Sequence, residues 1–333
     1  MSAKPLVSVC IQTYQHRNFI AAAIDSVLSQ QTDFEWEIII GEDDSTDGTR
    51  EICQSYAAKY PGLIRLFLRD EKDKIFIRGK MTGRFNFLSN LKEARGQYIA
   101  LLDGDDCWTS NNKLQQQVEM FRTHPQMALC THRYIKQLPG GRTELPLSAY
   151  WKETAAIYPS SSLLKEYYVF MSAVMFPASN INNLPAWFWE LPFIDYALMI
   201  YLSRFGDIGY LPGIMTRYNV HSKGMWSAAR EPENKIRLWD ALTLMALHME
   251  GDYQEAMEKG RERTGHDLVA YYRTHAWKNS VWFRKELATH RFAVDSVLLK
   301  DLTKTRTPLE FLQNIGNGSK DFARQVLRIL RIR

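Results

Sequence analysis

The sequence contains few cysteines, and none of them forms a C-x-x-C pair. The four are Cys10, Cys53, Cys107 and Cys130. Their spacing matches no zinc site, so the pattern argues against a disulfide scaffold and against a zinc module. This usage fits a reduced, cytoplasmic setting best, and Cys10, which lies in an apolar run, is expected to pack as a small hydrophobic residue.

Long hydrophobic runs are also missing. No run reaches the ~18 apolar residues that cross a bilayer, and Met1 to Lys4 is too short and polar for a signal peptide. The net charge of +5 is mild, and no dense Lys/Arg block precedes the last turns, so no nucleic-acid partner is expected. The 333 residues, 45% hydrophobic and 24% charged, are typical of a globular protein with one large or two modest domains.

Glycine is absent from the segment in which several nucleotide-binding classes need it. A dinucleotide-binding dehydrogenase would carry G-x-G-x-x-G after its first strand, whereas this chain reads QTYQHR over residues 12–17. A nucleotidyltransferase would show a Gly-rich phosphate loop at the same place. The P-loop motif and the G-x-S-x-G nucleophile elbow are missing as well.

The first ~135 residues alternate between strand and helix patterns. Strands are predicted at 7–12, 36–40, 64–68, 98–102 and 127–131, and helices near 19–28, 52–60, 85–91 and 114–121, with Gly96 as the C-cap of the third helix. Such repeated units predict an α/β fold with a mostly parallel sheet flanked by helices.

Polar side chains gather where the predicted strands end. Thr13 and Tyr14 follow the first strand, Glu42 to Asp44 the second, and Asp103 to Asp106 the fourth. Ligands of such sheets bind at the carboxyl ends of the strands. The convergence of these three segments therefore predicts a ligand site at one edge of the sheet.

The strongest of these signals is the triplet Asp103-Gly104-Asp105. Carboxylates at i and i+2 on extended backbone point the same way, and a glycine between them lets a ligand approach closely. Oxygen ligands of this kind suit Mg²⁺ or Mn²⁺ that already carries phosphate oxygens. The alternative is a solvated acidic turn that caps the next helix.

The acidic cluster from Glu42 to Asp44 allows two interpretations. A carboxylate there can accept hydrogen bonds from a ribose hydroxyl or a base N–H. Alternatively, Asp44, Ser45 or Asp47 caps the following helix. Both interpretations can hold, on different residues.

The second half of the chain is organised differently. Residues 138–144 (LPGGRTE) predict a loop that leaves the first half, and an aromatic-rich stretch follows it. We expect an α/β half with the ligand site at 1–137, a second half of the same domain at 138–230 that would bind a second substrate, and a helical extension at 231–333. In residues 321–333, apolar and arginine side chains occupy separate helical faces, which predicts either a membrane-surface helix or a helix docked on the protein.

Three ordered runs carry a family resemblance: VSVCIQTYQHRNFIAAAIDSVLSQQ, EIIIGEDDSTDGTR and ARGQYIALLDGDDCWTSNNKLQQQV. They resemble the inverting family 2 glycosyltransferases with the GT-A fold, especially a bacterial group that reads TYNH, GEDCSTD and DGDDYW. The resemblance covers the first ~135 residues. It continues more weakly in SAVMFP, FIDYALMIYLSRFGDIGYLP and MTRYNVHSKGMWS, to about Ser227.

The resemblance implies a role for each matching residue. Thr13 and Tyr14 would line the nucleotide base, Glu42 would contact the uracil, and Asp103 would meet the ribose or the metal. Asp105 and His221 would hold the divalent cation at the diphosphate, and Asp195 would be the catalytic base. Three further residues are expected on the donor side on weaker grounds: Asp44, Arg84 and Gly104.

Several of these positions have plainer alternatives. An aspartate such as Asp195 often caps a helix, His221 is compatible with an ordinary surface histidine, and Arg84 with a solvated cation. Two positions depart from the family pattern. Glu42 is one methylene longer than the usual aspartate, and Asn219 replaces an arginine that would contact phosphate, although Arg217 lies two residues earlier.

The resemblance implies an inverting transfer of a sugar from a UDP-linked donor to a glycan or lipid-linked hydroxyl, and the acidic triplet agrees with dependence on Mn²⁺ or Mg²⁺. The rival hypothesis is a non-catalytic nucleotide- or sugar-binding protein on the same scaffold, because fold alone does not establish function. The expected location is cytoplasmic, with peripheral membrane contact through the C-terminal tail as a further possibility.

Overall fold

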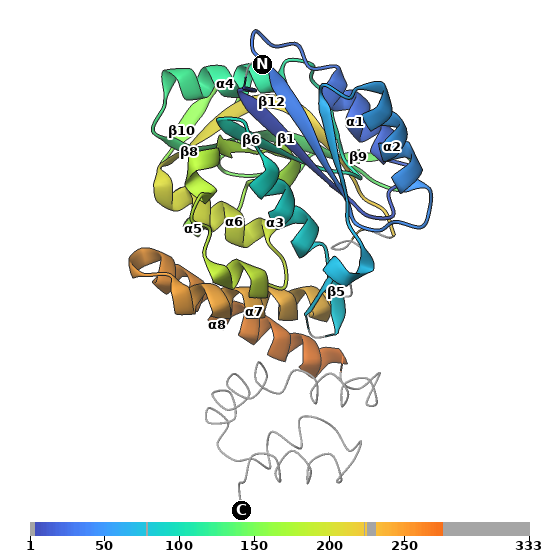
Figure 1. Cartoon of the computed structure of the whole chain (residues 1–333). Coiled ribbons are helices and arrows are strands. Elements are labelled where there is room, and N and C mark those ends of the chain that lie inside the picture. The colour runs from blue at the N-terminus through green and yellow to red at the C-terminus, as the bar shows by residue number, and fades with distance from the viewer. Residues whose placement is uncertain (1–3, 78, 223, 225–230, 276–333) are drawn as a thin grey trace, which may run out of the picture. The chain divides into compact units, whose positions relative to one another are not determined.

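The computed structural model describes residues 4–77, 79–222, 224 and 231–275 (Figure 1). The chain divides into two compact units, Met1–Ala228 and Ala229–Arg333. In the described part of the first unit, one large mixed sheet runs in the order β10-β12-β8-β11-β6-β1-β2-β3. The strands of this path are β1 (Val7–Thr13), β2 (Trp36–Glu42), β3 (Ile64–Leu68), β6 (Tyr98–Asp103), β8 (Met127–Gln137), β10 (Ala156–Tyr158), β11 (Met175–Pro177) and β12 (Asp207–Asn219).

Short strands and helices complete the first unit. β7 (Cys107–Trp108) pairs with β12, β9 (Thr143–Glu144) pairs with β8, and β4 (Ile75–Ile77) forms a hairpin with β5 (Lys80–Thr82). The α-helices are α1 (Ile20–Leu28), α2 (Thr49–Lys59), α3 (Arg84–Glu93), α4 (Lys113–Thr123), α5 (Ser162–Lys165) and α6 (Asp195–Leu202). The 3-10 helices are η1 (Glu71–Asp73), η2 (Met171–Ala173), η3 (Ala178–Ile181), η4 (Ala186–Glu190) and η5 (Ser203–Phe205).

Helices cover both faces of the sheet, as the alternating pattern predicts. Val7, Val9 and Ile11 of β1 share a core with apolar residues of α1, α2 and α4. On the opposite face, Cys10 lies against α3, where its thiol donates to the carbonyl of Asn90 (3.6 Å). Figure 1 shows α3 and the α1–α2 pair on opposite sides of the strands. The predicted GT-A-like fold class is therefore confirmed, and Cys10 is fully buried as expected.

The site depends on the register of the parallel strands. β1 pairs in parallel with both β2 and β6, which places Thr13 opposite Glu42 and Gln12 opposite Asp103. The carboxyl ends of these strands therefore meet at one edge. Asn90 of α3 secures this arrangement, because its side-chain N–H donates to the carbonyl of Ile11 at 3.1 Å.

Two local predictions were wrong. Gly96 does not cap α3, whose last residue is Glu93. A Cβ at Gly96 would lie 2.5 Å from the Ser8 nitrogen, so the glycine is needed for close packing against β1. The 138–144 segment does not lead away from the first half either. It is a hairpin turn that brings β9 back onto β8, so both predicted halves share one sheet.

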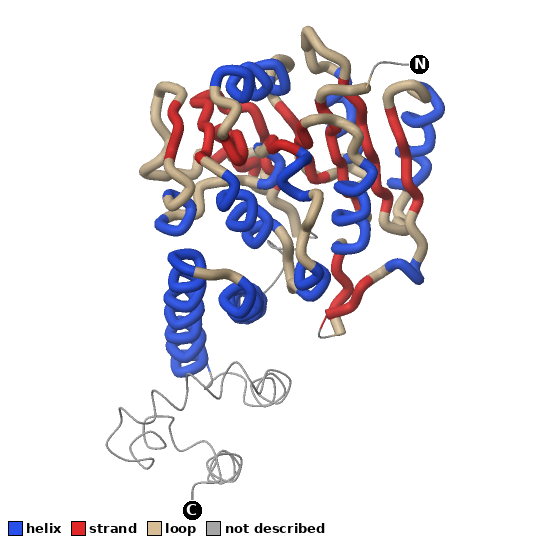
Figure 2. The backbone as a smooth tube through the Cα atoms, turned by 60° about the vertical axis from the view of Figure 1, so that its left-hand side comes forward, coloured by secondary structure: helices blue, strands red, loops and turns tan. Residues whose placement is uncertain are grey.

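The second unit is helical where the structure describes it, with α7 (Glu231–His248) and α8 (Gly251–His275) (Figure 2). The predicted amphipathic tail at 321–333 lies outside the described residues, so its role stays a prediction. Within the described ranges, no helix combines the length and the hydropathy that crossing a membrane requires.

Candidate active site

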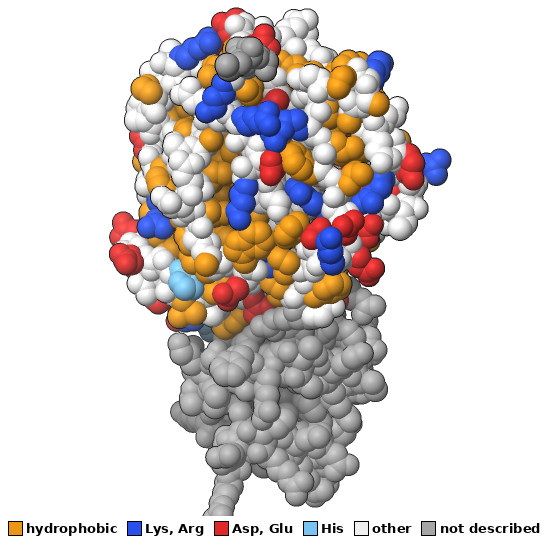
Figure 3. All heavy atoms as spheres, in the orientation of Figure 1, with side chains coloured by type: hydrophobic (Ala, Val, Ile, Leu, Met, Phe, Trp, Pro, Cys, Tyr) orange, Lys and Arg blue, Asp and Glu red, His pale blue; other side chains and the backbone are white. Residues whose placement is uncertain are grey.

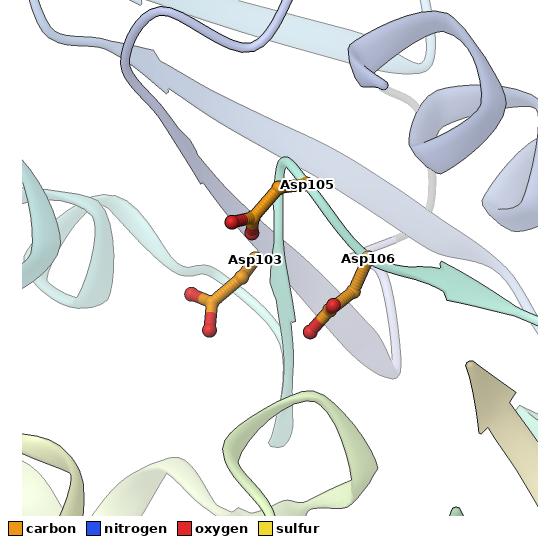
Figure 4. A group of neighbouring side chains, drawn as sticks. All are labelled: Asp103, Asp105 and Asp106. Carbon is orange, nitrogen blue, oxygen red and sulfur yellow. The ribbon is translucent and has the colours of Figure 1, made fainter. Parts of the chain in front are cut away.

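Three carboxyl groups crowd the turn that follows β6. Asp103, Asp105 and Asp106 each offer an oxygen within 4.8 Å of the others (Figure 4). Burial, and then the charges of Asp105 and Asp195, raise the pKa of Asp103 to about 8, although a hydrogen bond from Gln12 (2.5 Å) opposes this. Like charges held this close repel one another, and a bound cation would relieve the repulsion.

Within this group, the carboxyl group of Asp106 is held in place by hydrogen bonds. It is almost fully buried, and both of its oxygens accept hydrogen bonds, from the Ser172 hydroxyl (2.7 Å) and from the Asn219 backbone N–H (3.1 Å). Ser172 Oγ also accepts the backbone N–H of Asp103 at 3.1 Å. One serine therefore connects the end of β6 to the carboxylate that closes the turn.

Asp105 faces two imidazoles. His221 Nε2 lies 3.0 Å and His16 Nε2 3.6 Å from the same oxygen, Asp105 Oδ2. Burial alone would raise the pKa of Asp105, but the hydrogen bond from His221 and the charges of His16 and His221 outweigh it and lower the pKa. The ring of Phe19 stacks on His221 (centroids 4.7 Å apart), which holds this imidazole in place.

His16 reaches this position because two strand-end loops are tied together. Gln15 adopts a left-handed backbone (φ 57°), and its N–H donates to Ser45 Oγ at 2.9 Å. The His16 N–H donates to Thr49 Oγ1 (2.9 Å) and the Arg17 N–H to Asp47 Oδ2 (3.1 Å). The loop after β1 therefore rests on the loop after β2, which aims His16 at Asp105.

The three acidic residues at the end of β2, Glu42 to Asp44, make different contacts. Glu42 is fully buried, and its carboxylate accepts from Arg50 Nε and from the Ser45 N–H (2.7 Å). Asp44 has a left-handed backbone (φ 62°) and pairs with Lys74 at 3.2 Å. Asp43 Oδ1 is buried with no hydrogen-bond partner among the described residues, and burial raises the pKa of Asp43 to about 6.

The remaining predicted donor residues lie as follows. Thr13 is buried and its hydroxyl meets His16 Nδ1 at 3.2 Å, while the ring of Tyr14 lies under Lys74 Nζ (5.3 Å). A Cβ at Gly104 would lie 2.7 Å from Thr13 Cβ, so packing on β1 requires this glycine. The interpretation of Gly104 as space left for a ligand therefore has a competing explanation.

Arg84 is not linked to the aspartates by any hydrogen bond or ion pair within the described ranges. It is buried in the first turn of α3, and its Nη1 donates to the Trp189 carbonyl at 2.6 Å. Its Nε and Nη2 are buried without partners there, and burial lowers its pKa to about 10. Its predicted contact with the donor stays a prediction.

Asp195 is the first residue of α6, after an N-cap at Ile194. The capping alternative therefore does not describe it, although the predicted helix start is correct. Asp195 is exposed to solvent, yet its pKa is raised. Desolvation by the surrounding protein is the largest cause and the charge of Asp105 adds to it, whereas a hydrogen bond from the backbone N–H of Asp195 lowers the pKa. The charge of Asp195 raises the pKa of Asp103, and the charge of Asp105 raises the pKa of Asp195, so Asp195 lies within electrostatic reach of the acidic turn.

Asn219 does not replace the missing arginine as a cation. Its side-chain N–H donates to the Asp105 carbonyl (2.7 Å), and its backbone N–H reaches Asp106. Arg217, which lies two residues before Asn219, interacts with Cys107 instead. Burial raises the pKa of the Cys107 thiol, and the charge and hydrogen bond of Arg217 lower it by less. Both residues therefore stabilise the Asp103–Asp106 turn and the strand that follows it.

The sequence gives no individual role to His16 or Ser172, and it includes Asp43 only as a member of the acidic cluster from Glu42 to Asp44. His16 belongs to the QTYQH run, so its place beside the TYNH pattern was an available signal. Asp43 lies between two other acids, and no local pattern distinguishes the three. Ser172 had no signal, because its link to Asp106 spans 66 positions.

A mostly parallel sheet flanked by helices, with acidic side chains where β2 and β6 end, is the arrangement of GT-A glycosyltransferases. Residues 8–176 match the model of glycosyl transferase family 2. The chain belongs to this family, and the resemblance found in the sequence is confirmed.

Two relatives and two solved structures extend the comparison. The uncharacterized protein Rv1520 of Mycobacterium tuberculosis is 31% identical over 69% of this chain, which spans 63% of that relative's length. The putative teichuronic acid biosynthesis glycosyltransferase TuaG of Bacillus subtilis is 38% identical over 35% of the chain and 42% of its own length.

S. aureus TarS 1-349, in complex with UDP-GlcNAc, superposes with a TM-score of 0.57 at 18% identity, over 87% of this chain and 80% of that chain. The mannosyltransferase PcManGT from Pyrobaculum calidifontis, in complex with GDP-Man and Mn²⁺, gives 0.51 at 14% identity, over 92% and 89%. At these identities the likeness shows the fold alone.

Proposed function

We propose that this chain transfers a sugar from a nucleoside-diphosphate sugar, most simply a UDP-linked one, to a hydroxyl group of a glycan or lipid-linked acceptor, with inversion at the anomeric carbon. One observation carries this proposal: the carboxyl group of Asp195, at the start of α6, is exposed to solvent and lies within electrostatic reach of the acidic turn at Asp103 and Asp105. The acidic turn would serve a binding module as well as an enzyme, whereas Asp195 offers the proton acceptor that transfer to a hydroxyl also requires.

The donor would lie across the ends of β1 and β2. Tyr14 and Thr13, at the end of β1, would line the base of the nucleotide. Glu42 already holds Arg50 and the Ser45 N–H, so we assign base recognition to its neighbour Asp43. The unpartnered oxygen of Asp43 is an acceptor that a base N–H would satisfy.

The residues present fit a divalent cation at the diphosphate. Asp105 and His221 offer an oxygen and a nitrogen 3.0 Å apart, and Asp103 adds a second carboxylate. The imidazole favours Mn²⁺ over Mg²⁺, which prefers oxygen ligands alone. When bound, the cation supplies positive charge to the departing nucleoside diphosphate.

The chain's own residues would carry out the proton transfer. Asp195 accepts the proton of the acceptor hydroxyl while the oxygen of that hydroxyl forms a bond to the anomeric carbon. The bond between that carbon and the phosphate oxygen breaks, and the nucleoside diphosphate leaves with the electron pair. A single displacement inverts the anomeric configuration.

A cytoplasmic site of action, with membrane contact through the C-terminal tail, belongs to the same proposal and rests on the sequence pattern alone.

The test is a panel of nucleotide sugars, first screened for binding by thermal shift with Mn²⁺ present. Each donor that binds is then assayed for release of the nucleoside diphosphate, with and without Mn²⁺ and a glycan acceptor. We expect binding of one nucleotide class and Mn²⁺-dependent release that increases with acceptor. Tight binding with no release under any condition would favour the non-catalytic alternative.

A further inference from the structure

A fully buried lysine, Lys113, begins the helix that follows the acidic turn. Lys and Arg side chains usually stand at the surface, as those on the face shown in Figure 3 do. Lys113 Nζ instead donates to Gln117 Oε1 at 2.7 Å and lies 3.9 Å from the centroid of the Trp108 ring. Burial lowers the pKa of this amine to about 7, so its position costs free energy that an apolar side chain would not.

Gln117 is also fully buried, and the two ends of its amide meet opposite partners. Oε1 accepts from Lys113, whereas Nε2 donates to the carbonyl of Ala173 (3.0 Å) and to that of Cys130 (3.1 Å). A reversed amide would place its NH₂ against the amine and its oxygen against two carbonyl oxygens. Lys113 therefore fixes the direction in which Gln117 donates, and Gln117 ties α4 to both η2 and β8.

Trp108 holds the neighbouring residue of η2. Its indole N–H donates to the Ser172 carbonyl at 2.9 Å, and the Thr216 hydroxyl donates to the same oxygen at 3.2 Å. Because Lys113 lies over this indole ring, one lysine contacts both Gln117 and Trp108, the two side chains that hold consecutive carbonyls of η2.

η2 in turn carries the side chain that closes the acidic turn. Ser172 Oγ donates to Asp106 (2.7 Å) and accepts the backbone N–H of Asp103 (3.1 Å), so it contacts both ends of the turn. A shift of η2 would therefore move the turn. An unbroken series of hydrogen bonds leads from Lys113 through Gln117 and η2 to these two aspartates.

We propose that Lys113 and Gln117 are positioning residues, which hold η2 where Ser172 keeps the acidic turn aligned for the cation. Apolar side chains at these two positions would fill the same space, but they would leave two buried carbonyls without donors and remove the tie between α4 and η2. The inference rests on the proposed function and extends it to residues that touch neither the donor nor the cation.

The test compares Gln117→Leu with Gln30→Leu in the full chain. Gln30 is the matched control, because it is a buried glutamine that also supports α4, accepting the Leu114 N–H at 3.0 Å, while its amide donates to the Ser110 carbonyl (2.6 Å) rather than to η2. Both variants should lower the midpoint of urea unfolding. Only Gln117→Leu should weaken Mn²⁺ binding, measured by electron paramagnetic resonance, by about tenfold, the smaller of the effects known for residues behind metal ligands.

Hydrogen exchange followed by mass spectrometry gives a second measurement, which requires no cation. The amides of Gly104 and Asp106 donate within or beside the turn, to the carbonyls of Gln12 (2.8 Å) and Asp103 (2.9 Å). Exchange in the peptide that contains residues 103–106 should be faster in Gln117→Leu than in wild type or Gln30→Leu. Equal exchange in all three proteins would overturn the inference.

The double variant Lys113→Met/Gln117→Leu separates positioning from stability. It removes the buried amine together with its acceptor, so its urea midpoint should rise above that of Gln117→Leu while Mn²⁺ affinity stays low. Should Gln117→Leu not fold, the double variant takes its place in the comparison with Gln30→Leu. Recovery of Mn²⁺ affinity along with stability, or equal Mn²⁺ affinities in the Gln117 and Gln30 variants, would contradict positioning. If the wild type binds no Mn²⁺, the metal site of the proposed function fails, and hydrogen exchange still decides whether Gln117 positions the turn.

Discussion

His221 Nε2 and Asp105 Oδ2 lie 3.0 Å apart, although 116 positions separate the two residues in the chain. The pair joins the turn after β6 to the segment after β12. In the absence of a cation, the imidazole donates to the carboxylate. Both groups are then already close enough to bind one ion together.

Asp105→Ala should abolish the Mn²⁺-dependent part of nucleotide affinity, because it removes a ligand of the cation. His221→Ala should weaken Mn²⁺ binding by about 100-fold or more, because it removes another ligand. Titration of Mn²⁺ followed by electron paramagnetic resonance measures both effects. His124→Ala, at the C-cap of α4, serves as the control. Wild-type Mn²⁺ affinity in His221→Ala would exclude it as a ligand.

Ser172 should act by positioning the acidic turn. Ser172→Ala leaves Asp106 Oδ2 buried without its donor, so we expect a loss of about 1–3 kcal/mol in the free energy of unfolding. Mn²⁺ affinity should fall as well, because Asp103 and Asp105 lose their alignment. Ser162→Ala removes another buried serine hydroxyl, bound to Tyr168, and should lower stability without changing Mn²⁺ affinity. Equal Mn²⁺ affinities in the two variants would argue against positioning.

Asp43 and Glu42 should separate in their effects on nucleotide binding. Asp43→Ala should weaken UDP binding by about tenfold and reduce the preference for UDP over CDP, because it removes an acceptor for a base N–H. Glu42→Gln should mainly lower stability, because it breaks the contact with Arg50. Isothermal titration calorimetry with both nucleotides distinguishes them. If Glu42→Gln weakened UDP binding and Asp43→Ala lowered only the stability, Glu42 would be the residue that recognises the base.

Ionisation of Asp43 should also make the free energy of unfolding depend on pH. Its folded-state pKa of about 6 lies above the ordinary value of 3.8, so the folded state binds more protons between these pH values. The contribution of Asp43 to stability therefore falls as pH rises from about 4 to about 6. Urea unfolding of wild type and Asp43→Asn across this window should give a difference that grows with pH in favour of Asn. A constant difference would contradict the raised pKa.

Much of the site follows from the sequence because strand ends are local signals. The apolar runs that end at Thr13, Glu42 and Asp103 fix three corners of the site once the strands are parallel. The remainder depends on pairings that no local pattern shows. Glu42 looks free in the sequence but is held by Arg50, and His16 reaches Asp105 only because Gln15 adopts a left-handed backbone. Gly96 resembles a helix cap, yet close packing against Ser8 explains it.

The most direct test of the account is the transfer rate of Asp195→Asn with the donor found in the panel. Asparagine keeps the shape of the side chain and the start of α6, so stability should change little. We predict that binding of the nucleotide sugar and of Mn²⁺ stays near wild type while kcat falls by about 100-fold or more, the usual effect of losing a general base. A near-wild-type kcat in this variant would contradict the assignment of Asp195 as the base.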